Sequence, residues 1–325
     1  MSKPKAGIFG VGSALPEKIV SNADLSKMVE TSDEWITERT GIKERRVTDY
    51  ETSTSDLALK AAQSALKDAG IAPEELDLIL VGTCTPDTLF PSTACILQDK
   101  LGAKNAKAFD VSAACSGFNF ALVTASSFIE SEMFKTILVV GADTLTKYLD
   151  WSDRGTCVLF GDGAGAAVIK AVEDGSGIIS NYLITEGAGG KFLVMPGGGS
   201  RDPEARNGRF IKMEGKDVFK FAVRALEKSI IESLKNANLQ IKDVDLLIPH
   251  QANIRIIDHA IKKLGLSKDK VYVNLHKYGN TSAASIPIAL DEAVKDGKLN
   301  KGNIVVLSGF GAGLTCGANV VKWSK

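Results

Sequence analysis

The sequence predicts an α/β fold made of two related halves. Residues 69–80, AGIAPEELDLIL, align without gaps with residues 237–248, ANLQIKDVDLLI, which lie 168 positions later. The same displacement brings ILVVG at 137–141 onto VVLSG at 305–309. Further on, GAAVIK at 165–170 resembles GANVVK at 317–322. The alternative explanation is that βαβ units resemble one another by composition, but a displacement that recurs at separated places favours duplication.

Each half alternates between amphipathic helices, turns and apolar strands. The helical pattern is clearest over residues 54–69 and 217–237. The strands ILVVGA and IVVLSG lack an apolar-polar alternation, so we expect both faces of these strands to be covered. Residues 187–215 are rich in turn formers and predict a central loop, which either covers the substrate or simply connects the halves.

Composition places the chain among ordinary globular proteins. It has 325 residues, of which 44% are hydrophobic and 24% are charged. Lysine plus arginine and aspartate plus glutamate both number 39, so no overall field favours nucleic acid or a membrane. The N-terminal apolar run is too short and glycine-broken for a secretory signal, and no stretch approaches ~18 uninterrupted apolar residues. We therefore expect a cytoplasmic protein that binds neither nucleic acid nor membrane.

The five cysteines form no CxxC pair. This arrangement favours reduced thiols over a disulfide framework or a zinc site, so no metal is expected. Cys115 is the candidate nucleophile because it lies between a short apolar strand and a helical pattern starting at about Ser116. The amides and positive dipole of a helix N-terminus favour the thiolate and can lower a cysteine pKa. A buried structural cysteine is the alternative.

Two more polar residues stand at equivalent places. His250 follows the apolar strand DLLIP, at the carboxyl end of a strand, where ligand groups gather in α/β sheets. Asn280 precedes a helical pattern in YGNTSAASIP, close to where the displacement of 168 carries the Cys115 neighbourhood. A pseudo-twofold axis would bring the thiol, the imidazole and the carboxamide together. A structural histidine is the alternative for His250.

Six segments together resemble the β-ketoacyl-acyl-carrier-protein synthase III family of the thiolase superfamily. The match runs nearly from end to end through TSDEWITERTGI, the Cys115 segment, DRGTCVLFGDGAGA, HQANIRI, YGNTSAASIP and GFGAGLTCGA. The resemblance implies a thiolase-like, duplicated five-layer αβαβα fold. Its N-terminal half, residues 1–172, would contain the cysteine, and its C-terminal half, residues 173–325, the histidine and asparagine.

The resemblance also implies the activity. Cys115 would take an acyl group from acyl-CoA, and malonyl-acyl carrier protein would lose carbon dioxide and attack the acyl-enzyme, with no cofactor. His250 and Asn280 would donate hydrogen bonds to the malonyl thioester carbonyl, and the backbone amides of Cys115 and Ala312 would form the oxyanion hole. An asparagine in place of the second histidine of elongating synthases favours the initiating branch.

Further residues are assigned by the same resemblance. The CoA site would use Thr31, Trp35, Arg39 and Arg154, with the adenine stacked between Trp35 and Arg154. The acyl pocket would involve Cys316 and also Phe90, which would extend across a homodimer interface. The basic patch for the carrier protein would consist of Lys220, Arg255, Lys262 and Lys263.

Other functions remain open on the sequence. A related condensing enzyme of polyketide, quinolone or head-to-head type shares the three polar residues. A papain-like hydrolase would use His250 as a base on Cys115 and release free acid. A catalytically inactive scaffold is disfavoured because all three polar residues are present. Cys316 and Ala312 replace an aromatic residue and a glycine of many relatives, which leaves the preferred primer open.

Overall fold

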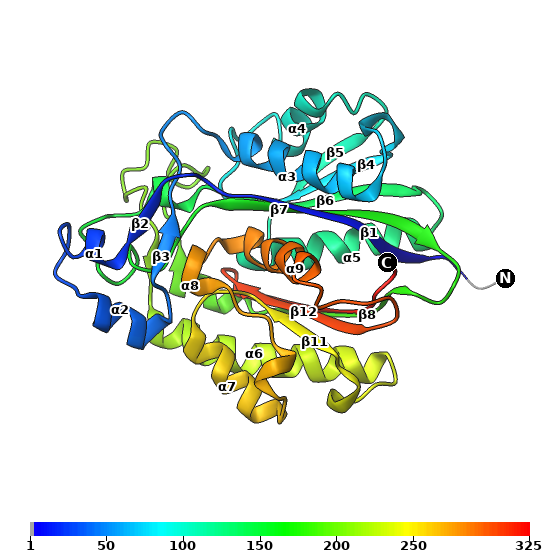
Figure 1. The fold of residues 1–325 in the computed structure, drawn as a ribbon. Coiled ribbons are helices and arrows are strands. Elements are labelled where there is room, and N and C mark those ends of the chain that lie inside the picture. Colours follow the sequence, from blue (N-terminus) through cyan, green and yellow to red (C-terminus); the bar gives the residue numbers. More distant parts are fainter. Residues whose placement is uncertain (1–2) are drawn as a thin grey trace.

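The computed structural model describes residues 3–325 as two β-sheets interleaved with three layers of helices (Figure 1). Helices α3 and α4 cover the outer face of the first sheet, α5 and α9 lie between the sheets, and α6 and α7 cover the second sheet. This is the predicted five-layer αβαβα arrangement. The helices are α1 (Asn22–Leu25), α2 (Asp33–Thr40), α3 (Thr54–Ala69), α4 (Thr93–Leu101), α5 (Gly117–Glu130), α6 (Gly215–Asn236), α7 (Ile254–Leu264), α8 (Leu275–Tyr278) and α9 (Ser285–Lys295).

The first sheet has the order β1-β7-β6-β4-β5, and the second has the order β11-β12-β13-β8. Strands β4, β5 and β6 are parallel, as are β11 and β12, whereas the remaining pairs of these sheets are antiparallel. The strands are β1 (Lys5–Ala14), β4 (Leu78–Gly82), β5 (Lys107–Val111), β6 (Thr136–Asp143), β7 (Gly163–Val172), β8 (Gly177–Thr185), β11 (Leu246–Pro249), β12 (Ile304–Gly311) and β13 (Thr315–Lys322).

The predicted duplication has a direct counterpart in the elements. Strands β4 and β6 and helix α5 each begin 168 residues before β11, β12 and α9. The same displacement joins two short turns, the 3-10 helix η2 (Ala114–Ser116) and the 3-10 helix η7 (Ser282–Ala284). The first sheet takes its strands from residues 5–172 and the second from residues 177–322. The boundary at residues 172 and 173 stays a prediction.

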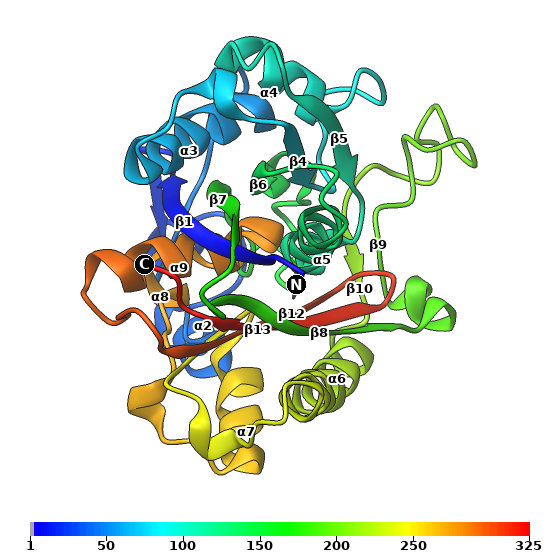
Figure 2. The same cartoon turned by 90° about the vertical axis from the view of Figure 1, so that its right-hand side faces the viewer.

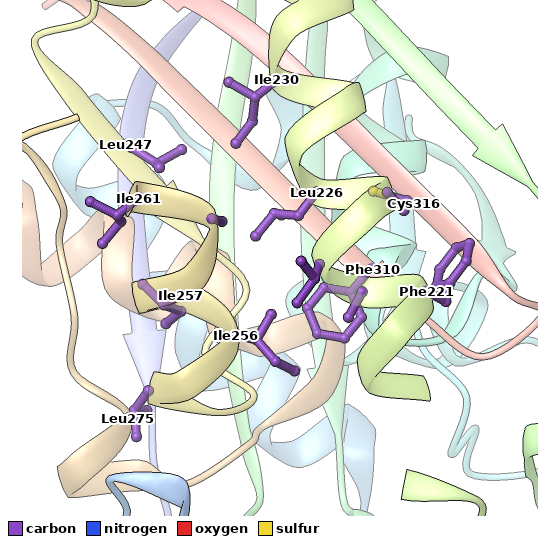
Figure 3. Packing of buried hydrophobic residues seen from close by; sticks show 14 of the residues in the cluster. Phe221, Leu226, Ile230, Leu247, Ile256, Ile257, Ile261, Leu275, Phe310 and Cys316 are labelled. Atoms are coloured by element: carbon purple, nitrogen blue, oxygen red, sulfur yellow. The ribbon is translucent and has the colours of Figure 1, made fainter. Parts of the chain in front are cut away.

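Apolar strands build the core on both faces of each sheet. Ile137 and Val139 of β6 pack between the sheets, whereas Leu138 and Val140 pack under α3 and α4. This confirms that the unalternating strand ILVVGA is covered on both faces. A further cluster fills the space between the second sheet and helices α6 and α7 (Figure 3).

The smaller elements surround these layers. Residues 187–215 contain the 3-10 helix η4 (Gly187–Phe192), β9 (Leu193–Val194) and β10 (Lys212–Met213), and the loop between β9 and β10 extends outward from the body of the molecule (Figure 2). Strands β2 (Ile19–Ser21) and β3 (Glu44–Arg46) pair near α2. Within residues 3–325, no helix is long and apolar enough to cross a membrane.

Candidate active site

Cys115 lies in η2, immediately before the central helix α5, and its side chain is almost fully buried. Ala114, the residue before it, has a φ of +46°, a left-handed conformation that residues with a Cβ rarely adopt. Ser282 occupies the equivalent position in the second half and has a φ of +52°. Such backbone strain persists only where the surrounding structure holds it, and it clusters at functional sites.

The η7 turn brings the second half against the sulfur. The Ser282 hydroxyl donates a hydrogen bond to Cys115 Sγ at 3.3 Å. The Ser282 backbone N–H donates to Asn280 Oδ1 at 2.9 Å. Because the amide oxygen of Asn280 is used in this bond, its NH₂ group is left to donate elsewhere.

His250 directly follows β11 and is buried, with 1% of its surface exposed. Its Nδ1 lies 2.6 Å from the Ser285 hydroxyl, which also accepts a hydrogen bond from the Gln251 backbone N–H at 3.4 Å. We assign the hydroxyl hydrogen to the bond with Nδ1, which places the ring hydrogen on Nε2. The Phe310 ring meets the imidazole edge to face at a centroid distance of 5.1 Å.

Burial shifts the pKa of both titratable groups of the site, His250 and Cys115. It lowers the pKa of His250 to about 3, so the imidazole is neutral at ordinary pH. It also raises the pKa of Cys115 to about 12, although the hydrogen bond from Ser282 acts in the opposite direction. The sequence led us to expect that the helix N-terminus would lower the pKa of this thiol. That expectation is wrong, because desolvation of the enclosed sulfur outweighs the helix terminus.

Cys115, His250 and Asn280 line one cavity of about 150 Å³. The structure thus brings together the three polar groups that the sequence singled out. The walls are otherwise largely apolar, and they come from the segment before β7, the segment that includes β9 and β10, and α6, α7 and β12: Leu159, Phe160, Leu193, Met213, Val218, Phe219, Ile256 and Phe310. Two of these residues, Leu193 and Met213, belong to the predicted central loop. This loop therefore forms part of the cavity wall in addition to connecting the two halves.

A second cavity of about 90 Å³ also reaches Cys115. Ala312 lines it, so the two residues proposed for the oxyanion hole meet there. Cys84 and Ser282 provide its polar lining, and its apolar walls are Ala114, Leu145, Phe160, Leu193, Val194, Met195 and Ile211. Strand β12 approaches Cys115 closely, since a Cβ on Gly311 would lie 2.6 Å from the Cys115 nitrogen.

The four residues assigned to CoA gather around helix α2. Trp35 is half-buried, and the guanidinium carbons of Arg39 and Arg154 lie 4.8 Å and 4.9 Å from its ring centroid. The Arg154 guanidinium also donates to the Glu30 carbonyl at 2.9 Å. The Thr31 hydroxyl beside them is buried and has no hydrogen-bond partner among residues 3–325.

The four basic residues assigned to the carrier protein are exposed on two adjacent helices. Lys220 lies on α6 next to Phe219, and Arg255 lies on α7 next to Ile256; both of these neighbours line the larger cavity. Lys220 pairs with Asp217 at 3.4 Å, and Lys263 of α7 pairs with Glu227 at 3.4 Å. Lys262 is exposed beside Lys263 on the same helix.

The two residues assigned to the acyl pocket do not reach either cavity of their own chain. Cys316 is fully buried on β13, and its sulfur lies 3.4 Å from the Ser229 hydroxyl of α6. Figure 3 shows it in the cluster that contains Phe221 and Leu226. Phe90 is 86% exposed on the surface.

Sequence reasoning missed Ser282, Ser285 and Cys84. The two serines were within the quoted motif YGNTSAASIP, and the displacement of 168 places Ser282 opposite Ala114 and Ser285 opposite Gly117. Cys84 follows the end of β4, and its sulfur lies 3.3 Å from Asp143 Oδ1 and 3.9 Å from the Ser282 hydroxyl. Within the described residues, no group of three or more histidine, cysteine, aspartate or glutamate side chains could hold a metal ion.

A duplicated five-layer fold with a buried cysteine at its centre is typical of condensing enzymes of the thiolase type, and known proteins agree. Residues 109–187 match the family described as 3-oxoacyl-[acyl-carrier-protein (ACP)] synthase III, and residues 234–323 match the C-terminal part of the same family. The chain belongs to the β-ketoacyl-[acyl-carrier-protein] synthase III family.

Individual relatives support this assignment over the whole length. A β-ketoacyl-[acyl-carrier-protein] synthase III from Caldanaerobacter subterraneus subsp. tengcongensis is 58% identical over 99% of both chains. The corresponding structure from Aquifex aeolicus is 49% identical, has a TM-score of 0.93 and covers 98% of this chain and 100% of its own. The priming β-ketosynthase of the R1128 polyketide pathway is 35% identical, has a TM-score of 0.94 and covers 100% of this chain and 98% of its own.

Proposed function

We propose that the chain condenses an acyl-CoA primer with malonyl-acyl carrier protein to give 3-oxoacyl-carrier protein, coenzyme A and carbon dioxide. In this role it would initiate fatty-acid synthesis. The observation that supports the proposal most directly is that Cys115, His250 and Asn280 line a single cavity. The chemistry needs only the two substrates and these side chains, so we propose no cofactor.

In the first half-reaction, the Cys115 sulfur attacks the carbonyl carbon of acyl-CoA. A bond forms between the sulfur and the acyl group, the bond between the acyl carbon and the CoA sulfur breaks, and the thiol proton leaves with coenzyme A. The backbone amides of Cys115 and Ala312 are our candidates for stabilising the charged oxygen of the tetrahedral intermediate. The second cavity, which touches both residues, would accept an apolar acyl chain.

In the second half-reaction, malonyl-carrier protein loses carbon dioxide. The electron pair of the broken carbon-carbon bond forms an enolate, whose carbon attacks the acyl group on Cys115 and releases the sulfur as a thiolate. The thiolate then takes up a proton from water, which restores the thiol for the next cycle. His250 and Asn280 would donate hydrogen bonds to the thioester oxygen as its negative charge develops. A neutral His250 suits this role, since it donates through Nε2 without requiring a buried positive charge.

The hydrogen bonds of Cys115 and His250 also help to distinguish condensation from the papain-like hydrolase alternative. In a papain-like enzyme the imidazole takes the proton of the cysteine. Among residues 3–325, the side-chain hydrogen bond to the Cys115 sulfur comes from Ser282, and His250 Nδ1 contacts Ser285 instead. Both contacts favour condensation. Incubation with acyl-CoA and malonyl-carrier protein should give the condensed product, and release of free acid alone would contradict the proposal.

A polyketide-priming role is the second candidate, supported by the likeness to the R1128 priming enzyme. It uses the same three polar residues, so the site does not separate the two. A competition assay would separate them: the purified enzyme would receive labelled acetyl-CoA with either malonyl-carrier protein of fatty-acid synthesis or the carrier protein of a polyketide pathway. Faster product formation on the fatty-acid carrier supports our proposal, and the reverse preference supports the second candidate.

For the two substrates we propose separate docking places. The adenine of CoA would enter between Trp35 and Arg154 and replace the contact that they make with each other, beside Arg39 and Thr31. The acidic carrier protein would bind the exposed basic residues of α6 and α7 at the edge of the larger cavity. These are Lys220, Arg255, Lys262 and Lys263.

We further propose that the enzyme is a cytoplasmic homodimer in which Phe90 closes the acyl pocket of the partner. Leu89 and Phe90 are 79% and 86% exposed, and Phe109 lies on β5, which ends the first sheet. Exposed apolar side chains and a free sheet edge are features that a second copy would cover. The free cysteines of the described chain suit a reducing compartment. Light scattering tests the dimer, and a monomeric enzyme would contradict it.

A further inference from the structure

Two serines, one in the η7 turn and one at the start of helix α9, contact all three polar groups of the site. Ser282 donates its hydroxyl to Cys115 Sγ at 3.3 Å and its backbone N–H to Asn280 Oδ1 at 2.9 Å. Three residues later, the Ser285 hydroxyl lies 2.6 Å from His250 Nδ1. Both serines are buried, so these hydrogen bonds are shielded from water and are correspondingly stronger.

We propose that these serines are positioning residues that serve different half-reactions. Ser282 acts on the sulfur of Cys115 during acyl transfer, whereas Ser285 acts on the imidazole of His250 during decarboxylation. The inference rests on the proposed function, because it assigns each serine to one step of that reaction.

The position of Ser282 is fixed from several sides. Its φ of +52° is held by the backbone N–H of Ala283, which donates to Asp143 Oδ2 at 3.2 Å. Strand β6 packs directly against this turn, since a Cβ on Gly141 would lie 2.1 Å from the Ala283 carbonyl oxygen. The hydroxyl is therefore held against Cys115. A hydrogen bond to an ionised acceptor is stronger than one to a neutral acceptor, so this contact favours the thiolate that attacks acyl-CoA.

Ser285 determines which nitrogen of His250 bears the hydrogen. The Gln251 N–H donates to its oxygen at 3.4 Å, and the serine hydrogen is directed to Nδ1, so Nε2 stays protonated. Because burial keeps the ring neutral, the tautomer decides whether the imidazole is a donor or an acceptor toward the substrate. Without Ser285, the ring hydrogen is free to move to Nδ1. Nε2 would then present a lone pair to the enolate oxygen.

Ser282 is tested by the rate of acyl transfer from acetyl-CoA and by the pH profile of Cys115 alkylation with iodoacetamide. Ser282→Ala should slow acyl transfer roughly tenfold and move the alkylation profile to higher pH. It should leave malonyl decarboxylation unchanged, because the backbone bond to Asn280 remains. Ser282→Gly also lacks the hydroxyl but relieves the strained φ, so it should be equally slow. A glycine variant with the wild-type rate would overturn the role of the hydroxyl.

Ser285→Ala should slow decarboxylation of malonyl-carrier protein roughly tenfold and leave the alkylation profile unchanged. Ser285→Thr keeps the hydroxyl and should restore most of the rate; a folded threonine variant as slow as the alanine variant would overturn the role of Ser285. Ser233→Ala is the matched control, since it removes a buried hydroxyl whose one hydrogen bond within residues 3–325 is to the Ile230 carbonyl, at 2.9 Å, and it should affect neither step.

The wild-type enzyme, measured in the same assays, shows whether a failure lies in the proposed function or in the roles assigned to the two serines. If it acylates Cys115 but forms no 3-oxoacyl-carrier protein, the proposed function fails. If it condenses normally while each serine variant loses both half-reactions equally, or loses neither, the proposed function stands and the division between the two serines is overturned.

Discussion

The η2 turn and the η7 turn are built alike but provide different chemistry. Each is a short 3-10 helix that begins with a left-handed residue and leads into a central helix. The first turn presents the sulfur of Cys115. The second has Ala283 at the equivalent position and instead presents the hydroxyls of Ser282 and Ser285 beside Asn280. A duplicated backbone thus places the proposed nucleophile in one half and, in the other, the groups that we propose assist it.

The strongest test of this difference removes the nucleophile. Cys115→Ala should abolish acyl transfer, because no other group on the η2 turn can form the thioester. It should retain decarboxylation of malonyl-carrier protein, since His250 and Asn280 remain in place. Intact-protein mass spectrometry and carbon dioxide release measure the two activities. Equal loss of both activities would contradict the division of the chemistry between the η2 and η7 turns.

The complementary change is made beside the second turn. Asn280→Ala should lower the decarboxylation rate about 10²–10³-fold, which is the usual cost of losing one hydrogen-bond donor to a developing oxyanion. Acyl transfer to Cys115 should stay close to the wild-type rate. A single-turnover experiment with acetyl-CoA provides that control. A large loss of acyl transfer would show that the two turns do not divide the reaction.

The buried histidine gives a prediction about pH. Its pKa of about 3 in the folded protein lies below the value of 6.5 for a free imidazole. The unfolded chain therefore binds more protons between these values, and the contribution of His250 to stability is full above about pH 6.5 and declines as the pH falls toward 3. Replacing it with His250→Gln should remove about 3 kcal/mol of this acid sensitivity near pH 4.5. Urea unfolding at several pH values measures it, and identical pH profiles for both proteins would contradict the burial argument.

The smallest expected effects lie at the surface, where we propose that the two substrates bind at separate places. Arg154→Ala should raise the KM for acyl-CoA roughly tenfold and leave the KM for malonyl-carrier protein unchanged. Arg255→Ala should raise the KM for malonyl-carrier protein by a few fold and leave the KM for acyl-CoA unchanged. This effect should weaken at high salt. Lys298, an exposed lysine that follows α9, offers a charge-matched control through Lys298→Ala. If both arginine variants changed the same KM, the proposed docking places would be wrong.

The features that the sequence predicted best are those that depend on helical periodicity and on the internal duplication. Helix α3 has the predicted bounds Thr54–Ala69, and α6 differs from its predicted range by two residues at the start and one at the end. The displacement of 168 placed Asn280 opposite the Cys115 region because β4, β6 and α5 recur with the same spacing. Periodicity and a repeated spacing can both be recognised directly in the sequence, so these features were predictable.

The remaining features depend on orientation and burial. The orientation of Cys316 follows from strand geometry: Thr315 points toward η2, where its hydroxyl lies 2.7 Å from that of Ser116, so the next side chain points to the opposite face. The proposed roles of Ser282 and Ser285 depend on hydrogen bonds that no local pattern specifies. The pKa of Cys115 depends on desolvation by segments far apart in the sequence, which a helix-terminus argument leaves out.

We propose that Cys115 holds the acyl group before condensation. The most direct test is intact-protein mass spectrometry after incubation with acetyl-, isobutyryl-, butyryl- and longer acyl-CoA, followed by a chase with malonyl-carrier protein. We predict that one acyl mass appears on the peptide that contains Cys115 and disappears during the chase as 3-oxoacyl-carrier protein forms. An acyl mass on another residue, or loss of the acyl group as free acid without condensed product, would rule out Cys115 as the acyl carrier of the condensation.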